Sequence, residues 1–103
     1  MRGEIWLARL DPTVGSEIQK TRPCVLISPP ELQYLRTVIV APMTTGGQPA
    51  PFRIPISFDG KRGLIVLDQI RTLDKTRLVK RLGKVPRPVV ASALRTLRDI
   101  FAE

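Results

Sequence analysis

The sequence predicts a mainly β fold, a small antiparallel β-barrel with one α-helix packed against it near the C-terminus. Short apolar and β-branched runs recur along the chain, and residues typical of turns separate them. There is no strand–helix–strand alternation of the kind that builds a parallel sheet. Only the C-terminal segment has an apolar stripe at helical spacing. With 103 residues the chain has the length of one domain, 1–103, and is too short for two.

The first two predicted strands flank the most informative stretch of the sequence. Residues 3–10 are expected to form a strand, and residues 24–27 a continuously apolar strand that is buried on both faces. The segment 11–23 between them contains carboxylates, an amide, hydroxyls and a guanidinium. Because ordinary hairpin loops need only about two to five residues, this longer loop indicates a functional segment suited to a phosphate or polar ligand.

A second loop is predicted after the third strand. Pro29 and Pro30 end the second strand, and we expect a short turn or helical stretch from there to Leu35. The β-branched residues of the segment 37–41 predict a central strand. The following segment, 42–51, is rich in Gly, Pro and Thr, which predicts a loop.

Two more strands are predicted in the middle of the chain. Residues 52–58 alternate between apolar and other side chains, but Pro55 cannot donate to a β-ladder, which predicts an edge strand or a bulge. The Asp-Gly pair at residues 59–60 indicates a turn. Residues 63–67 predict a further buried strand that runs into the segment 68–72.

The last third of the chain is expected to contain short elements and then the helix. Asp74 is predicted to cap a short helix that runs to Lys80, and residues 81–85 to form one more short strand. Pro88 suits the first turn of a helix. Five or six strands, one helix and one or two short helical turns are therefore expected. The apolar stripe of the helix, a predicted packing face, consists of Val89, Val90, Ala93, Leu94, Leu97, Ile100 and Phe101.

The charge balance indicates a polyanionic partner. The chain has 17 Lys and Arg against 9 Asp and Glu, a net charge of +8, and twelve of the cations are Arg. Because Arg binds phosphate through two parallel hydrogen bonds, this composition favours nucleic acid. Only five residues are aromatic, so a broad platform for stacking bases is not expected.

Several classes of chemistry are excluded by composition. The chain has no His and one cysteine, Cys24, which excludes His-based acid–base catalysis, a Ser–His–Asp triad, an internal disulfide and a Cys–His zinc site. We predict that Cys24 is a buried, reduced thiol. The carboxylates show no spacing typical of a metal site, so neither metal nor cofactor is expected. No apolar run has the length of a membrane span and no signal peptide is evident, so we expect a cytoplasmic chain.

The remaining polar groups suit a reaction whose nucleophile belongs to the substrate. RNA is such a substrate, because its 2′-hydroxyl can attack the neighbouring phosphorus. An Arg could bind the resulting phosphorane, a hydroxyl could donate a hydrogen bond to it, and a carboxylate or Arg could assist the proton transfer.

Four sequence blocks, at residues 11–17, 21–23, 40–45 and 68–74, occur in this order along the chain. Together they resemble the MazF/PemK toxins of toxin–antitoxin systems, and the resemblance extends from about Met1 to the C-terminal helix. It implies an SH3-like barrel that forms a homodimer. It also implies a sequence-specific, metal-independent endoribonuclease that cleaves single-stranded RNA and leaves 2′,3′-cyclic phosphate and 5′-hydroxyl ends. A cognate antitoxin protein would neutralise such a toxin.

The resemblance also implies roles for individual residues. Arg22 and Thr44, or Thr45 in place of Thr44, correspond to the catalytic Arg and Thr of the family, and Glu17 to its Gly-Ser-Glu carboxylate. Some relatives have an Arg where this chain has Val66, and some have a His in the first loop, which this chain lacks. Both departures favour a mechanism based on Arg22 and Thr44. The RNA-binding residues that we predict are Ser16, Gln19, Thr45, Phe52, Arg53, Asp68, Gln69 and Arg71.

Each candidate also has a purely structural interpretation. Arg22 could only fasten the loop, Thr44 could cap a strand end, and Glu17 could be a solvated loop charge. Asp68 and Arg71 could pair with each other as scaffold. The cations between residues 71 and 87 could be an RNA track or a solvated surface, and we expect a mixture.

Two alternative functions remain at the level of the whole protein. One is a non-nucleolytic toxin of the same fold that inhibits DNA gyrase, and the other is an RNA-binding barrel without catalytic activity. Cleavage of RNA in the presence of EDTA would distinguish the nuclease from both.

Overall fold

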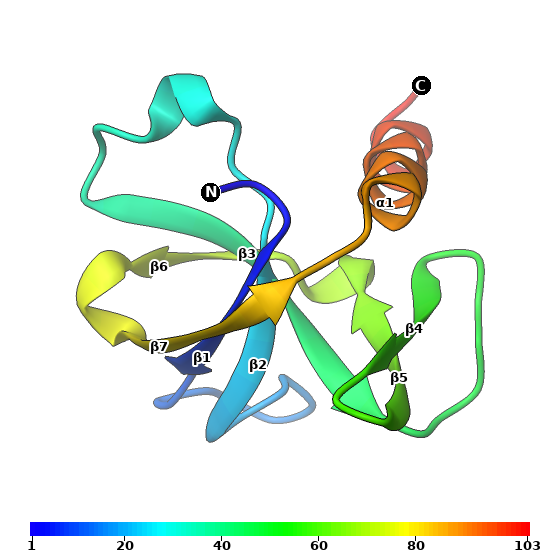
Figure 1. Ribbon diagram of the computed structural model, residues 1–103, viewed down its shortest axis with the longest axis horizontal. Coiled ribbons are helices and arrows are strands. Elements are labelled where there is room, and N and C mark those ends of the chain that lie inside the picture. The colour runs from blue at the N-terminus through cyan, green and yellow to red at the C-terminus, as the bar shows by residue number, and fades with distance from the viewer.

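The structure, a computed structural model, describes residues 1–103 and consists of seven β-strands, three 3₁₀ turns and one α-helix (Figure 1). This architecture confirms the mainly β fold with a C-terminal helix that the sequence predicts. It contains more strands and more turns than expected. The elements in chain order are β1 (Glu4–Arg9), β2 (Thr21–Leu26), η1 (Pro30–Leu32), β3 (Thr37–Thr45), β4 (Arg53–Phe58), β5 (Lys61–Val66), η2 (Leu67–Gln69), β6 (Arg71–Asp74), η3 (Lys75–Arg77), β7 (Leu78–Lys84) and α1 (Arg87–Ile100).

The strands form one antiparallel sheet in which β3 is central. The order is β4-β5-β3-β2-β1-β7, and β6 also pairs with β3. Along one edge of β3, residues 37–40 pair with β6 and residues 43–45 pair with β5, while β2 occupies the other edge. The sheet is barrel-like but not closed, because β4 and β7 each have an unpaired edge. The edge position of β4 confirms the prediction made from Pro55.

Two hydrophobic clusters fill the interior. The larger one joins α1 to the sheet through Ala93 and Leu97, which are both buried. The smaller one lies mainly among β1, β2, β3 and β6 and includes the free thiol of Cys24, which is buried as predicted. The apolar stripe of α1 is thus a packing face, except at its end, where Ile100 and Phe101 are 42% and 70% exposed. The helix is neither long nor apolar enough to cross a membrane.

Both loop boundaries predicted near the candidate residues were wrong. Arg22 and Pro23 belong to β2 rather than to the end of the first loop, and β3 continues to Thr45. Pro42, where the sequence predicted the end of the strand, lies inside β3. Residues 37–40 before it pair with β6, and residues 43–45 after it pair with β5. Proline therefore interrupts the strand pattern of the sequence without ending the strand.

The segment after β5 also differs from the prediction. The expected continuous run is broken by η2, and β6 follows as a separate short strand. Asp74 does cap a turn, because its carboxylate accepts a hydrogen bond from the backbone N–H of Thr76 at 2.9 Å. The expected helix to Lys80 is wrong, since η3 is a single turn and β7 begins at Leu78. β7 pairs with β1 and begins three residues before the strand 81–85 that the sequence predicts.

Candidate active site

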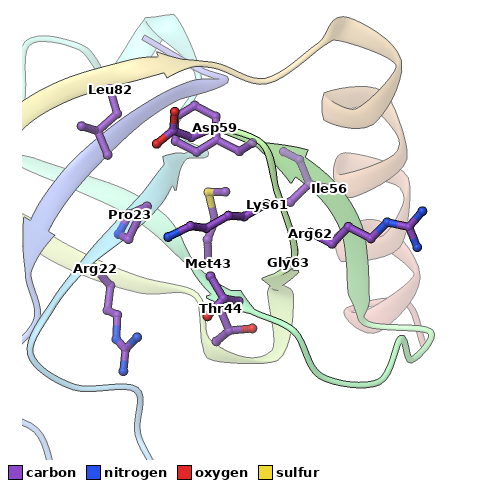
Figure 2. A pocket seen from close by; sticks show the side chains of 12 residues that line it. Arg22, Pro23, Met43, Thr44, Ile56, Asp59, Lys61, Arg62, Gly63 and Leu82 are labelled. Atoms are coloured by element: carbon purple, nitrogen blue, oxygen red, sulfur yellow. The ribbon is translucent and has the colours of Figure 1, made fainter.

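A pocket of about 370 Å³ lies where β2 begins, β3 ends and the β4–β5 hairpin turns back (Figure 2). Its apolar lining comes from Pro23, Met43, Ile56, Phe58 and Leu82. Its remaining lining is largely polar and includes three cations and one carboxylate. The pocket therefore combines a surface for the apolar face of a base or sugar with a cationic surface for phosphate.

The register of β2 and β3 brings Arg22 and Thr44 together. Cys24 pairs with Pro42, and Arg22 and Thr44 stand two residues from this pair along their strands toward the same end of the sheet. Because strand side chains alternate between faces with a period of two, both residues project from the same face. Both line the pocket, so the structure brings together the two residues predicted to be catalytic.

The guanidinium of Arg22 is available to a ligand. Its Nε donates to the backbone oxygen of Gln19 at 3.3 Å, and it takes part in none of the three ion pairs of the protein. Figure 2 shows the side chain extending on the same side of the pocket as Thr44. An Arg that is oriented through Nε keeps its two terminal nitrogens free for an oxyanion.

Gly63 lets the backbone of β5 approach the end of β3. A Cβ at this position would overlap the carbonyl oxygen of Thr44. Gly63 pairs with Thr45 on one side and with Ile56 on the other. Because Gly63 has no side chain, Thr44 and Thr45 can lie close to the β4–β5 hairpin, which completes the pocket.

Among the predicted residues of the first loop, Glu17 does not line the pocket. Its Oε1 accepts a hydrogen bond from the backbone N–H of Val14 at 2.7 Å, and its own N–H donates to the Val14 oxygen at 3.2 Å. Ser16 is exposed within this turn, and Gln19 contacts Arg22 through its backbone oxygen.

A second group of predicted residues lies at the start of β4. Arg53 donates to both carboxylate oxygens of Asp68, each at 3.1 Å, and this hydrogen-bonded pairing raises the pKa of Arg53. The guanidinium also lies 5.8 Å from the centre of the Phe52 ring. The alternative in which Asp68 pairs with Arg71 is therefore wrong, because the carboxylate faces β4.

Gln69 and Arg71 lie away from the pocket. The side-chain oxygen of Gln69 accepts from the backbone N–H of Ile18 at 2.8 Å and so ties the first loop to η2. Arg71 lies near Cys24, where burial raises the pKa of the thiol to about 12 and the Arg71 charge opposes that rise. Of the predicted site residues, the pocket itself contains only Arg22, Thr44 and Thr45.

The cations between residues 71 and 87 divide into two kinds. Lys75 donates to a backbone oxygen next to η1 at 2.6 Å, Arg77 donates to the backbone of the first loop, and Arg81 pairs with Glu4 at 3.5 Å. Lys80 is exposed and forms no ion pair. Several of these cations therefore hold the scaffold rather than forming one continuous track.

The β4–β5 hairpin adds three residues to the pocket lining that were not predicted as site residues: Asp59, Lys61 and Arg62. The signal was present, because the alternation of residues 52–58 defines the inward face of β4. A two-residue turn then places Lys61 opposite Phe58, on that same face.

The fold and the pocket define a class: a small, barrel-like β protein with a pocket that is lined by Arg22, Thr44 and cations without ion-pair partners. No group of three His, Cys, Asp or Glu side chains is arranged to hold a metal ion. A family model described as "PemK-like, MazF-like toxin of type II toxin-antitoxin system" matches residues 1–101. The chain therefore belongs to this family, which confirms the resemblance seen in the sequence.

Individual relatives agree with this assignment. Endoribonuclease PemK of Escherichia coli is 41% identical over 107 residues, covering 97% of this chain and 80% of PemK. The structure of MazF from Deinococcus radiodurans matches with a TM-score of 0.84 at 24% identity, covering 96% of this chain and 93% of that one. An endoribonuclease in complex with its cognate antitoxin, from Mycobacterial species, matches with a TM-score of 0.78 at 19% identity, covering 96% and 91%. These two structures support the fold.

Proposed function

We propose that the protein is a toxin that cleaves single-stranded RNA at specific sequences without a metal ion, by attack of the RNA 2′-hydroxyl on the adjacent phosphorus. The observation that carries this proposal is the placement of Arg22 and Thr44 in one pocket, with the terminal nitrogens of Arg22 unpaired. The 41% identity to endoribonuclease PemK supports RNA as the substrate.

The residues of the pocket suit the charge that develops in this reaction. The 2′-oxygen bonds to phosphorus as the bond from phosphorus to the 5′-oxygen breaks, and the leaving 5′-oxygen takes up a proton from water, which yields a 2′,3′-cyclic phosphate and a 5′-hydroxyl. Negative charge builds on the non-bridging oxygens of the phosphorane. Arg22 would donate two hydrogen bonds to these oxygens and the Thr44 hydroxyl would donate another, and both interactions strengthen in the transition state.

A different group must accept the proton of the 2′-hydroxyl, because a guanidinium donates hydrogen bonds and has no acceptor atom. We assign this role to Glu17. Its carboxylate would have to leave the Val14 N–H when RNA enters, which requires the first loop to change conformation. Ser16 and Gln19 would contact the RNA from the same loop.

The groups around η2 and β4 are suited to selecting the RNA sequence. Asp68 offers carboxylate oxygens, and Gln69 retains its amide NH₂ group as a donor to a base edge. Phe52 is 39% exposed and offers a ring for stacking beside Arg53. Arg71, like Thr45, would contact the sugar–phosphate backbone.

We also propose a symmetric homodimer and a cognate antitoxin. The exposed apolar side chains of Ile100 and Phe101 at the end of α1 support the dimer, because one patch used twice would cover them. The net charge of +8 supports an acidic, partly disordered antitoxin segment that displaces residues 14–21 and covers Arg22. The mycobacterial endoribonuclease of the same fold is known in complex with its cognate antitoxin.

The test is incubation of the purified chain with a long, unstructured RNA in EDTA, followed by primer-extension mapping and analysis of the product ends. We expect cleavage at a defined sequence with 2′,3′-cyclic phosphate ends. Cleavage that requires added metal would refute the mechanism. Binding without cleavage would favour the inert RNA-binding barrel, and inhibition of gyrase supercoiling by a chain that leaves RNA intact would favour the gyrase toxin.

A further inference from the structure

Lys61 is the exposed last residue on the face of the β4–β5 hairpin that packs against the core. The pairs Ile54–Ile65, Ile56–Gly63 and Phe58–Lys61 stack along this hairpin. Paired residues of an antiparallel ladder share a face, and this face packs into the larger hydrophobic cluster. Lys61 occupies the final position of that face, at the mouth of the pocket.

The hairpin places this lysine in a defined position. Asp59 and Gly60 both have positive φ, 54° and 73°, as a tight two-residue turn of type I′ requires. Phe58, the partner of Lys61, packs against β7, where a Cβ on Gly83 would lie only 3.0 Å from its ring. The base of the Lys61 side chain is therefore held by the turn and by this contact.

The ammonium group of Lys61 has no carboxylate partner in the protein. It takes part in none of the three ion pairs, although Asp59 lines the same pocket. Figure 2 shows the side chain extending toward Pro23 on β2, whereas the neighbouring Arg62 points away from the pocket. Two unpaired cations, Arg22 from β2 and Lys61 from β5, thus approach the pocket from opposite walls.

We infer that Lys61 binds a phosphate oxygen of the RNA, from the wall of the pocket opposite Arg22. The inference rests on the proposed RNA substrate and adds a second residue that contacts it. A lysine ammonium is a compact point charge without the planar fork of Arg, so it suits a phosphate better than a base edge. The contact forms in the bound ground state and persists in the transition state, so it contributes to binding rather than to the chemical step.

The experiment compares Lys61→Gln with Arg95→Gln. Both variants remove one positive charge from an exposed position, but only Lys61 lines the pocket, because Arg95 lies on the exposed face of α1. The probe is a 2′-O-methyl RNA carrying the mapped cleavage sequence, which cannot be cut because it lacks the nucleophile. Its dissociation constant is measured by fluorescence anisotropy across a series of salt concentrations.

For Lys61→Gln we expect the slope of log Kd against log salt to fall by about 0.7, the value for one phosphate contact with a single strand. Arg95→Gln should keep the wild-type slope, and Lys61→Arg should restore it. With cleavable RNA, KM should rise about tenfold in Lys61→Gln while kcat stays within about threefold. Lys61→Met, which keeps most of the aliphatic stem, should behave like Lys61→Gln if the ammonium is what matters.

The outcomes separate this inference from the proposed function. If the wild-type chain cleaves RNA and Arg22→Ala abolishes cleavage, but Lys61→Gln keeps the wild-type slope or shifts it no more than Arg95→Gln, only the role of Lys61 is overturned. A changed sequence preference with an unchanged slope would also overturn it, because it would indicate contact with a base. If the wild-type chain neither binds nor cleaves RNA, both proposals fail.

Discussion

Two pockets of the protein have comparable sizes, but the charged groups that line them differ in whether they have ion-pair partners. The candidate active site measures about 370 Å³, and a second pocket of about 430 Å³ is lined in part by Met1, Glu4 and Trp6. In the second pocket the carboxylate of Glu4 accepts from the Met1 ammonium at 2.7 Å and from Trp6 Nε1 at 3.1 Å. In the first, Arg22 and Lys61 form no ion pair.

The two pockets therefore differ in whether their charged side chains have ion-pair partners, and much less in volume. In the second pocket, the bonds from the terminal ammonium and from Trp6 hold the pKa of Glu4 below its usual value, so this charge stabilises the fold. In the first, Arg22 and Lys61 have no such partner within the protein. Substitution of the unpaired cations in the first pocket should therefore change activity and leave stability almost unchanged, and substitution of Glu4 in the second should do the reverse.

The largest effect is expected from Arg22→Ala. The RNA cleavage rate should fall about a hundredfold or more, the scale of losing one oxyanion donor. The free energy of unfolding should change by less than about 0.5 kcal/mol, because the only side-chain hydrogen bond lost is the 3.3 Å contact with Gln19. Initial cleavage rates and urea denaturation measure the two quantities. Arg95→Ala, on the exposed face of α1, is the control and should retain full activity. Full activity of a folded Arg22→Ala chain would contradict the assignment.

Gly63→Ala should change the first pocket through its backbone. The added Cβ would overlap the Thr44 oxygen, so β5 must move away from β3, at a cost of about 2 kcal/mol in the free energy of unfolding. Urea denaturation measures the loss, and cleavage should weaken as Thr44 shifts. Ser57→Ala, at an exposed position of the same hairpin, should be neutral. A Gly63→Ala variant as stable as the wild type would show that β5 and β3 do not approach in this way.

The next prediction concerns Cys24 in β2, the strand that connects the two pockets. β2 contributes Arg22 to the first pocket and Leu26 to the second. Burial raises the pKa of this thiol from 9.0 to about 12. The unfolded chain therefore loses the proton at a lower pH than the folded chain, and stability falls as the pH rises above about 9. The expected loss is about 1.4 kcal/mol per pH unit up to the folded pKa.

Urea denaturation at pH 8 and pH 10 measures this dependence, with Cys24→Ala as the reference that lacks the thiol. The wild type should lose about 1.4 kcal/mol more than Cys24→Ala between these two values. An identical pH dependence of the two proteins would mean that the thiol is accessible to solvent.

The smallest effect is expected from Glu4→Gln in the second pocket. At neutral pH the variant should lose at most about 1 kcal/mol of stability, because the ion pairs of Glu4 are partly exposed. The folded pKa of Glu4 lies below its ordinary value of 4.5, so its stabilisation is present above that value and disappears as the pH falls through the folded pKa. The difference between variant and wild type, measured by thermal unfolding, should therefore shrink in acid. Reduced RNA cleavage at unchanged stability would instead assign a function to the second pocket.

Local patterns in the sequence were sufficient for much of this structure. The alternation around Pro55 predicted an edge strand, the pair at residues 59–60 predicted a tight turn, and the apolar stripe after Pro88 predicted the packing face of α1. These features depend on residues within a few positions of one another, so the backbone preferences and periodicity of a short segment are enough to predict them. Arg22 and Thr44 were predicted to be catalytic from the resemblance of short sequence blocks to the MazF/PemK family.

Only the tertiary structure decided which of these residues meet. The pairing of Cys24 with Pro42 places Arg22 beside Thr44. The pairing of β4 with β5 places Lys61 at the pocket, and the fold brings Asp68 within hydrogen-bond distance of Arg53. Each of these depends on hydrogen bonds and packing between segments far apart in the chain, whose register no local pattern contains.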